Sequence, residues 1–281
     1  MALGILTNVA ATYAENNLNQ TQGSLQSVLQ QLSSGSRINS GADDAAGLSV
    51  ADGLRANEAA LTQSAQNATN GVGLLQTADG ALSQVTNLLD RATTLATEAL
   101  NGGLTTAQTT AADTEFQSIV TEIGNIGTAT NFNSNPVFSA TATNFVVTDG
   151  TATGTTTIAA TIGVLTAASV GTATGGGAGA TLSGLSLVTG ATAALAAVNS
   201  AITDVSNQRG AIGANINQLN AAANVASTEE VNLSSAESNI RSTNYGQATS
   251  DLAKFQVLSQ TGIAALAQAN SVQQEILKLL Q

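Results

Sequence analysis

Apolar residues recur at steps of three and four over two long stretches near opposite ends of the chain, residues 18–101 and 195–281. This spacing places the apolar side chains on one face of an α-helix, as in coiled coils and helical bundles. The stretch between them is rich in Thr, Ala, Gly and Ser and has almost no charge. The pattern predicts a mainly helical fold in which N- and C-terminal helices pair. A small β-rich insertion in the middle is expected to form an outer domain.

The N-terminal half predicts three helices separated by turn-forming residues. The first ends at the Ser-Ser-Gly-Ser run of residues 33–36, and Asp43 or Asp44 is suited to capping the second helix. The second helix covers the region Leu61–Leu100 and stops at the Asn-Gly-Gly run of residues 101–103. A shorter third helix follows.

The spacing also predicts irregularities within these helices. A shift of three residues between Leu75 and Ala78 indicates a stammer, a local overwinding of the coiled coil. Arg209 interrupts an otherwise apolar stripe, so it either fixes the register of the seam or packs its stem and extends its head into solvent. The last helix repeats its apolar pairs eleven residues apart, a period that drifts opposite to a heptad.

Two sets of apolar residues are therefore candidates for packing between helices. The expected seam of the bundle consists of Leu82, Val85, Leu89, Ile202, Val205, Ile212, Ile216 and Leu219. The terminal helices are expected to supply a self-assembly core of Leu18, Leu25, Val28, Leu32, Leu252, Phe255, Ile263 and Leu266.

Composition and charge exclude several classes of function. The chain has no Cys and no His, which excludes disulfides, Cys/His metal sites and catalysis by a nucleophile paired with His. The middle segment has one acidic residue, Asp149, so it cannot build a site with two carboxylates. We expect no enzymatic activity, no metal and no cofactor.

The net charge of −11 argues against binding to nucleic acid or to anionic membranes, both of which need basic patches. No apolar run approaches the roughly 20 residues of a membrane-spanning helix. The first residues lack a basic region and a long apolar run, so we expect no cleaved signal peptide.

Short blocks at both ends of the chain resemble the termini of bacterial flagellins. In the N-terminal part the blocks are residues 16–19 (NNLN), 32–35 (LSSG), 37–40 (RINS), 43–47 (DDAAG), 61–63, 66–68 and 80–82. In the C-terminal part they are residues 238–240 (SNI), 244–245 (NY), 266–270 (LAQAN) and 277–281 (LKLLQ). The blocks follow the family order across residues 1–136 and 195–281. Residues 131–134 resemble a family hairpin that usually has Gly where Ser134 stands.

This resemblance implies a structural subunit that polymerises with itself into the extracellular flagellar filament used for swimming. The implied layout places residues 1–40 and 243–281 in an inner helical core, residues 41–136 and 192–242 in a surrounding bundle, and residues 137–191 in a variable outer domain. The implied partners are the flagellar export apparatus, a flagellin chaperone, the filament cap and hook-associated proteins. The alternatives are a hook–filament junction protein and, from a different class, a surface coiled-coil adhesin, which usually needs a signal peptide and an anchor.

The resemblance also points to recognition by the host. Arg91, Leu95 and Glu115 stand at the places of a helical patch in flagellins detected by the vertebrate flagellin-sensing Toll-like receptor. The second Arg of the family patch and its adjacent Glu are replaced by Thr93 and Thr94. Alternatively, Arg91 and Glu115 form an ion pair between two helices and have no receptor role.

The hydroxyl-rich middle segment suggests a modification. With charge almost absent there, attached sugars would hydrate an exposed surface, although Thr also serves β-strands with alternate hydroxyls in water. The candidate O-glycosylation sites are Thr151, Thr153, Thr155, Thr156 and Thr157.

Overall fold

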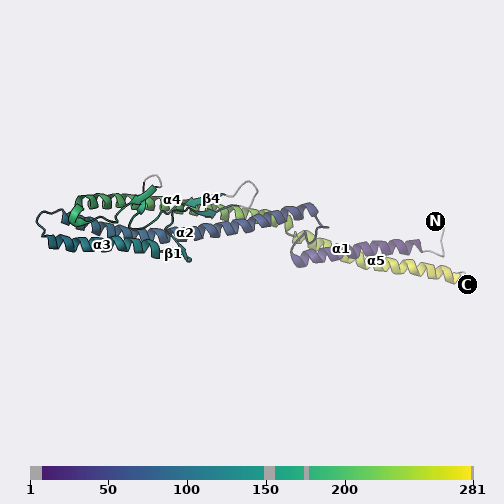
Figure 1. Cartoon of the computed structure of the whole chain (residues 1–281). Coiled ribbons are helices and arrows are strands. Elements are labelled where there is room, and N and C mark those ends of the chain that lie inside the picture. The colour runs from purple at the N-terminus through teal and green to yellow at the C-terminus, as the bar shows by residue number, and fades with distance from the viewer. Residues whose placement is uncertain (1–7, 149–155, 174–176, 280–281) are drawn as a thin grey trace. The chain divides into compact units, whose positions relative to one another are not determined.

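The computed structural model describes residues 8–148, 156–173 and 177–279 and confirms the mainly helical fold with a small β-rich insertion (Figure 1). Contacts divide the chain into two compact units, residues 1–56 with 232–281, and residues 57–231. The helices are α1 (Val9–Ser34), α2 (Ala45–Ala99), α3 (Thr106–Ala129), α4 (Leu187–Arg241) and α5 (Tyr245–Leu279). Across the described residues, none of these helices is both long enough and apolar enough to cross a membrane.

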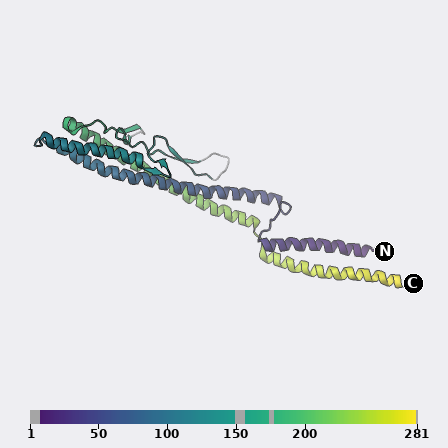
Figure 2. The ribbon, with the colours of Figure 1, turned by 60° about the horizontal axis from the view of Figure 1, so that its bottom comes forward.

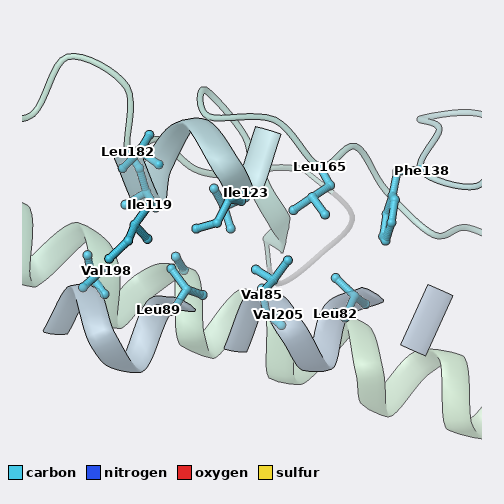
Figure 3. Packing of buried hydrophobic residues seen from close by; sticks show 14 of the residues in the cluster. Leu82, Val85, Leu89, Ile119, Ile123, Phe138, Leu165, Leu182, Val198 and Val205 are labelled. Atoms are coloured by element: carbon cyan, nitrogen blue, oxygen red, sulfur yellow. The ribbon is translucent and has the colours of Figure 1, made fainter. Parts of the chain in front are cut away.

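The second unit is built on α2, α3 and α4, which contribute side chains to one apolar core (Figure 3). A capping box starts α3, because the Thr105 side chain accepts from the main chain of Gln108 and the Gln108 side chain accepts from the Thr105 main chain. The Asp113 carboxylate of α3 accepts a hydrogen bond from the Leu187 main-chain nitrogen at 2.6 Å. This bond satisfies a free N–H group at the start of α4 and ties the two helices together.

The buried face of α2 follows one heptad without interruption, so the predicted stammer is wrong. Ser64 and Gly71 occupy buried positions where the sequence pattern favoured their apolar neighbours Ala65 and Val72. The insertion fills the space above these small residues. The buried positions of this stretch are Leu61, Ser64, Ala68, Gly71, Leu75, Ala78, Leu82, Val85, Leu89 and Ala92.

The buried face of α4 is displaced by one residue at three of the predicted seam positions, where Ala194, Ala201 and Gln208 are buried in place of Leu195, Ile202 and Arg209. Gln208 lies in the core at 3% exposure, whereas Arg209 lies at its edge, so Arg209 is not a seam residue. Its guanidinium Nε is 2.7 Å from Asp79 Oδ1, and the side chain is 36% exposed. Among the predicted seam residues, Leu82, Val85, Leu89, Val205, Ile212 and Leu219 are buried, while Ile202 and Ile216 are partly buried.

The insertion forms three two-stranded antiparallel hairpins in its described part. The strands are β1 (Asn131–Phe132) with β2 (Asn135–Pro136), β3 (Thr143–Val146) with β4 (Thr157–Ala160), and β5 (Val170–Ala173) with β6 (Gly177–Ala180). The β1–β2 turn has φ values of 50° at Asn133 and 64° at Ser134. Ser134 therefore adopts the left-handed conformation that Gly would adopt without steric cost.

These hairpins share the core of the helical bundle. Phe138 of the insertion lies above Leu82, Leu165 lies near Ile123, and Leu182 lies beside Ile119 (Figure 3). The division by contacts accordingly keeps the insertion in the same unit as the bundle. The domain boundaries expected from the sequence stay predictions.

Candidate self-assembly surface

Helices α1 and α5 lie side by side and run antiparallel (Figures 1 and 2). At one end, Asn8 Nδ2 donates to the Ala269 carbonyl at 3.0 Å. At the other end, the Thr243 main-chain nitrogen donates to the Gly35 carbonyl at 3.0 Å. Between them, Leu18 is close enough to Gly262 that an added Cβ would lie 3.3 Å from Leu18 Cδ1.

The inner faces of both helices follow heptad spacing. On α1 the buried and partly buried positions include Ala11, Ala14, Leu18, Thr21, Leu25, Val28 and Leu32. On α5 they include Ala248, Leu252, Phe255, Ser259, Gly262, Leu266 and Ala269. Seven of the eight residues predicted for the self-assembly core therefore lie in this contact, and Ile263 is the exception.

The interpretation of α5 as an eleven-residue repeat is wrong for this contact. Ile263 is 54% exposed, and the seam passes instead through Ser259 and Gly262. Ser259 and Gly262 are small enough to let the helices approach closely. The sequence pattern missed them because it selected only large apolar residues. Heptad steps counted from Leu252 and Phe255 would have found both positions.

Two chain segments meet at the end of the helix pair where α1 stops and α5 starts. Gly35 ends α1 with φ of 70°, a left-handed cap that favours glycine, and its N–H donates to the Gln31 carbonyl. The Arg37 main-chain nitrogen then donates to the Arg241 carbonyl at 2.6 Å. The Arg37 guanidinium adds a bond of 2.8 Å to the Ile240 carbonyl, so the segments before and after the helix pair are held together.

Two neighbouring aspartates have different roles in the turn that leads to α2. Asp44 is the residue that caps α2, because its Oδ1 accepts from the Gly47 main-chain nitrogen at 2.8 Å. The Asp43 carboxylate accepts from the main-chain nitrogens of Asn39 and Ser40 at 3.0 and 2.8 Å. These bonds stabilise the ionised form and lower the pKa of Asp43.

The outer faces of α1 and α5 retain apolar side chains in contact with solvent. Val257 is 59% exposed and lies opposite the seam, two residues from Phe255 and from Ser259. Leu258 and Ile263 flank the seam on either side. A helix with apolar residues on all its sides is normally buried in its working environment. We call this set the terminal surface; it consists of Val9, Tyr13, Leu29, Val257, Leu258, Ile263 and Val272.

The predicted receptor patch is only partly exposed. Arg91 pairs with Glu115 through two bonds, Nε to Oε1 at 2.7 Å and Nη2 to Oε2 at 2.9 Å, and both side chains are about half-exposed. Hydrogen bonding to Arg91 lowers the pKa of Glu115. Leu95 is 2% exposed and belongs to the core of the bundle, because its helical position faces inward. Leu95 is therefore unavailable to a partner in this conformation.

The candidate glycosylation sites fall on and beside one hairpin. Thr156 and Thr157 are exposed, and the Thr156 carbonyl accepts from the Val147 main-chain nitrogen at 2.8 Å. Thr157 begins β4 opposite Val146. The other three candidates, Thr151, Thr153 and Thr155, lie outside the described residues.

The terminal regions match known families. The family described as the bacterial flagellin N-terminal helical region matches residues 5–143, and the bacterial flagellin C-terminal helical region matches residues 195–280. The chain is 31% identical over 274 residues to a flagellin of Halalkalibacterium halodurans, a match that spans 98% of each chain. It is 34% identical over 279 residues to the flagellar filament 30.7 kDa core protein of Treponema maltophilum, spanning 97% of this chain and 98% of that one. A match to flagellin 1 of Proteus mirabilis is 39% identical over 151 residues but spans only 54% of this chain and 41% of that protein.

Proposed function

Because this chain belongs to the bacterial flagellin family, we propose that it is the subunit that polymerises with copies of itself into the flagellar filament for swimming. The family suggested by the terminal sequence blocks is thereby confirmed. The relatives that match over nearly their whole length are a flagellin and a filament core protein, which favours a bulk subunit over a junction protein or an adhesin. The observation that carries the mechanism is the terminal surface, which is exposed in the described part of the single chain.

Apolar burial supplies the driving force for assembly in this proposal. Val257, Leu258 and Ile263 are 59%, 43% and 54% exposed in the single chain. Fully burying such a side chain contributes about 1.5–3 kcal/mol relative to full exposure. Burying several of these residues together against neighbouring subunits offsets part of the loss of rotational and translational freedom on association.

Charge is distributed so that copies of the chain can meet at this surface. Of the net charge of −11, α1 carries only Glu15. The charges of α5 cancel, because Asp251 and Glu275 are matched by Lys254 and Lys278. The two helices together therefore contribute −1, and the repulsive charge lies elsewhere on the chain.

The test places a charge on the terminal surface without touching the intramolecular seam. Val257→Asp is expected to raise the critical concentration for polymerisation at least about tenfold, equivalent to 1.4 kcal/mol, since a carboxylate would be buried between subunits. Assembly is measured by sedimentation and electron microscopy after seeding with filament fragments. Helix content by circular dichroism is expected to stay unchanged in the monomer.

Thr114→Asp is the matched control, because Thr114 is an exposed residue of α3 and the change adds the same charge outside the terminal surface. Its critical concentration is expected to stay near that of the wild type. Filaments that form equally well from Val257→Asp would overturn the role of the terminal surface.

We also propose that the chain reaches the cell exterior through the flagellar export apparatus without a cleaved signal peptide, and that a flagellin chaperone covers its exposed apolar residues beforehand. The filament cap and hook-associated proteins are the expected neighbours at the filament ends. The proposed role is structural and not enzymatic. An N-terminal peptide that differs in mass between intracellular and filament protein would contradict export without cleavage.

The layout and surface of the filament are part of the proposal. Residues 1–40 and 243–281 are placed innermost and residues 137–191 outermost, where the exposed Thr156 and Thr157 would be accessible to glycosylation. Intact mass spectrometry of native filaments tests the modification. A mass equal to the unmodified 27.8 kDa chain would contradict it.

Recognition by the flagellin-sensing Toll-like receptor is proposed for Arg91 and Glu115, which are about half-exposed on α2 and α3. Arg91→Glu is expected to lower receptor activation in a reporter assay, because it reverses the charge of the patch. The double change Arg91→Glu with Glu115→Arg is expected to restore the ion pair but not activation. Restored activation would mean that the pair acts only by stabilising the bundle.

A further inference from the structure

The sequence contains two Asn-Gly pairs, Asn70-Gly71 and Asn101-Gly102, and the structure places them in opposite environments. An Asn followed by Gly is the pair most prone to intramolecular attack, because Gly presents no side chain to hinder ring closure. The reaction also requires a main-chain nitrogen that is free to approach the side-chain amide. Local structure therefore decides which of the two pairs reacts.

Asn101-Gly102 lies in the turn between α2 and α3. Asn101, Gly102 and Gly103 are all exposed, and the Gly102 N–H donates no hydrogen bond within the described part of the chain. The Gly103 N–H donates to Asn101 Oδ1 at 3.3 Å. This bond polarises the side-chain carbonyl in the direction that stabilises negative charge on its oxygen.

Asn70-Gly71 lies inside α2, with Asn70 29 residues before Ala99 at the end of the helix. The helical main chain bonds the Gly71 N–H to the carbonyl four residues earlier and holds its nitrogen away from the Asn70 side chain. Gly71 is also buried, and a Cβ there would meet Phe145 at 2.9 Å and Leu219 at 3.0 Å. Asn70 can react only when this part of the helix opens.

We propose that Asn101 is a site of spontaneous deamidation, at which the protein acquires an additional carboxylate as it ages. The Gly102 nitrogen loses its proton to solvent base and attacks Asn101 Cγ, forming a five-membered succinimide. The bond from Cγ to the side-chain nitrogen breaks, and that nitrogen takes up a proton and leaves as ammonia. Water then opens the ring at either carbonyl and yields aspartate or isoaspartate, with no change in oxidation state.

The new carboxylate would stand in an unfavourable position. The Asn101 N–H donates to the Glu98 carbonyl at 2.9 Å, so the residue lies at the C-terminal end of α2, where free carbonyls carry partial negative charge. The Glu98 side chain adds a second like charge three residues earlier. Deamidation is therefore expected to loosen the α2–α3 turn.

The experiment follows both sites in the same full-length protein during incubation in mildly alkaline buffer. Cleavage after glutamate isolates residues 99–115 around Asn101, and cleavage after arginine isolates residues 56–91 around Asn70. Mass spectrometry measures the gain of one mass unit, and an isoaspartyl methyltransferase reports the isoaspartate product. In folded protein Asn101 is expected to react at least about tenfold faster than Asn70, since Asn70 must wait for local opening.

Two comparisons make the result specific to the structure. In strong denaturant the two sites are expected to react at similar rates, because both are then unprotected Asn-Gly pairs. Gly102→Ala is expected to slow the reaction at Asn101, whereas the matched control Gly103→Ala alters the same turn and leaves the Asn-Gly pair intact. Equal rates at Asn70 and Asn101 in folded protein, or an unchanged rate in Gly102→Ala, would overturn the proposal.

Discussion

Gln208 is a polar side chain in the apolar seam of α4. It is 3% exposed, and neither its amide nitrogen nor its amide oxygen has a hydrogen-bond partner among the described residues. A buried polar group without a partner costs about 1–3 kcal/mol. The seam therefore contains one position at which stability is not optimised.

We expect Gln208→Leu to raise the free energy of unfolding by about 1–2 kcal/mol, because Leu has a similar volume and no polar group to desolvate. Urea denaturation followed by circular dichroism measures the change. Gln218→Leu, at an exposed position of the same helix, is the control and is expected to alter stability by less than about 0.5 kcal/mol. A less stable Gln208→Leu variant would indicate that the amide is bonded to a buried water.

The Arg91–Glu115 ion pair predicts a dependence of stability on pH. The pKa of Glu115 is lowered from its ordinary value of 4.5 by the hydrogen bonds from Arg91. A carboxylate with a lowered pKa contributes stability above its unfolded value, and this contribution is lost as the pH falls through the folded value. The difference in stability between the wild type and Glu115→Gln should thus shrink as the pH drops below 4.5.

Arg91→Ala provides the control for this measurement. In that background, Glu115→Gln is expected to show little dependence on pH in the same interval, because the partner that lowers the pKa is absent. A difference that grows toward acid pH would contradict the assignment of the pKa shift to Arg91.

Residue spacing predicted the faces of the helices but not every residue in them. Two adjacent rows of residues in α4 both recur every seven residues. One row contains Ile202, Arg209 and Ile216, and the other contains Ala201 and Gln208. The larger apolar residues favoured the first row, yet the closely packed core takes the small Ala201 and leaves both Ile residues at the edge. Choosing between adjacent rows requires knowledge of the neighbouring helix, which periodicity does not contain.

At the scale of elements, the insertion is attached to the bundle through close contacts at glycines. A Cβ at Gly127, near the end of α3, would overlap the main-chain carbonyl of Leu165. A Cβ at Gly171 would lie 2.8 Å from the Val205 main-chain nitrogen in α4. Asp204 Oδ2 also accepts from the Ala180 main-chain nitrogen at 3.1 Å. These contacts explain why the hairpins share the core of the bundle.

We expect Gly127→Ala to lower the free energy of unfolding by about 1–3 kcal/mol, because the added methyl group meets main-chain atoms that cannot rotate away. Gly124→Ala is the control, since its nearest contact is an ordinary 3.5 Å to the Ala167 main-chain nitrogen. That variant should gain up to about 1 kcal/mol from better helix propensity. Thermal denaturation of both variants measures the contrast, and equal effects would argue against close packing at Gly127.

The sequence supported the existence of helices better than the arrangement of strands. Long runs of apolar residues at helical spacing predicted α2, α4 and α5, because burial against a neighbouring helix repeats over many turns. The insertion was recognisable from Gly and β-branched residues, but its pairing was not. The reason is visible at Ser64, whose hydroxyl donates to the Thr148 carbonyl at 2.5 Å and accepts from the Thr148 nitrogen at 3.0 Å. Such contacts across 84 residues leave no trace in local spacing.

For the whole molecule, the net charge of −11 opposes the association of identical chains. Salt shortens the range of this repulsion to about 10 Å at 0.1 M. We therefore expect polymerisation to be faster at moderate salt than at very low salt, as measured by light scattering after seeding. A rate that falls steadily with added salt would mean that specific ion pairs between subunits outweigh the net repulsion.

The same scale shows what the terminal sequence blocks could and could not predict. They identified the family, and the resemblance implied that the chain's two ends pair, as α1 and α5 do. The contact of small residues at Ser259 and Gly262 was missed, and Ile263 was assigned to the seam instead. In the described part of the chain the residues of the terminal surface are 43–68% exposed, and they could be identified only from this exposure in the structure.

The bond from Asn8 to the Ala269 carbonyl joins residues 261 positions apart. A chain that emerges from the ribosome N-terminus first must therefore complete nearly its whole length before α1 meets α5. Contacts between residues so distant in sequence also form slowly, because a large loop must close before they are made. The inner face of α1 therefore stays without its partner until synthesis is nearly complete. In a chain that is truncated before α5, this face is never buried by α5.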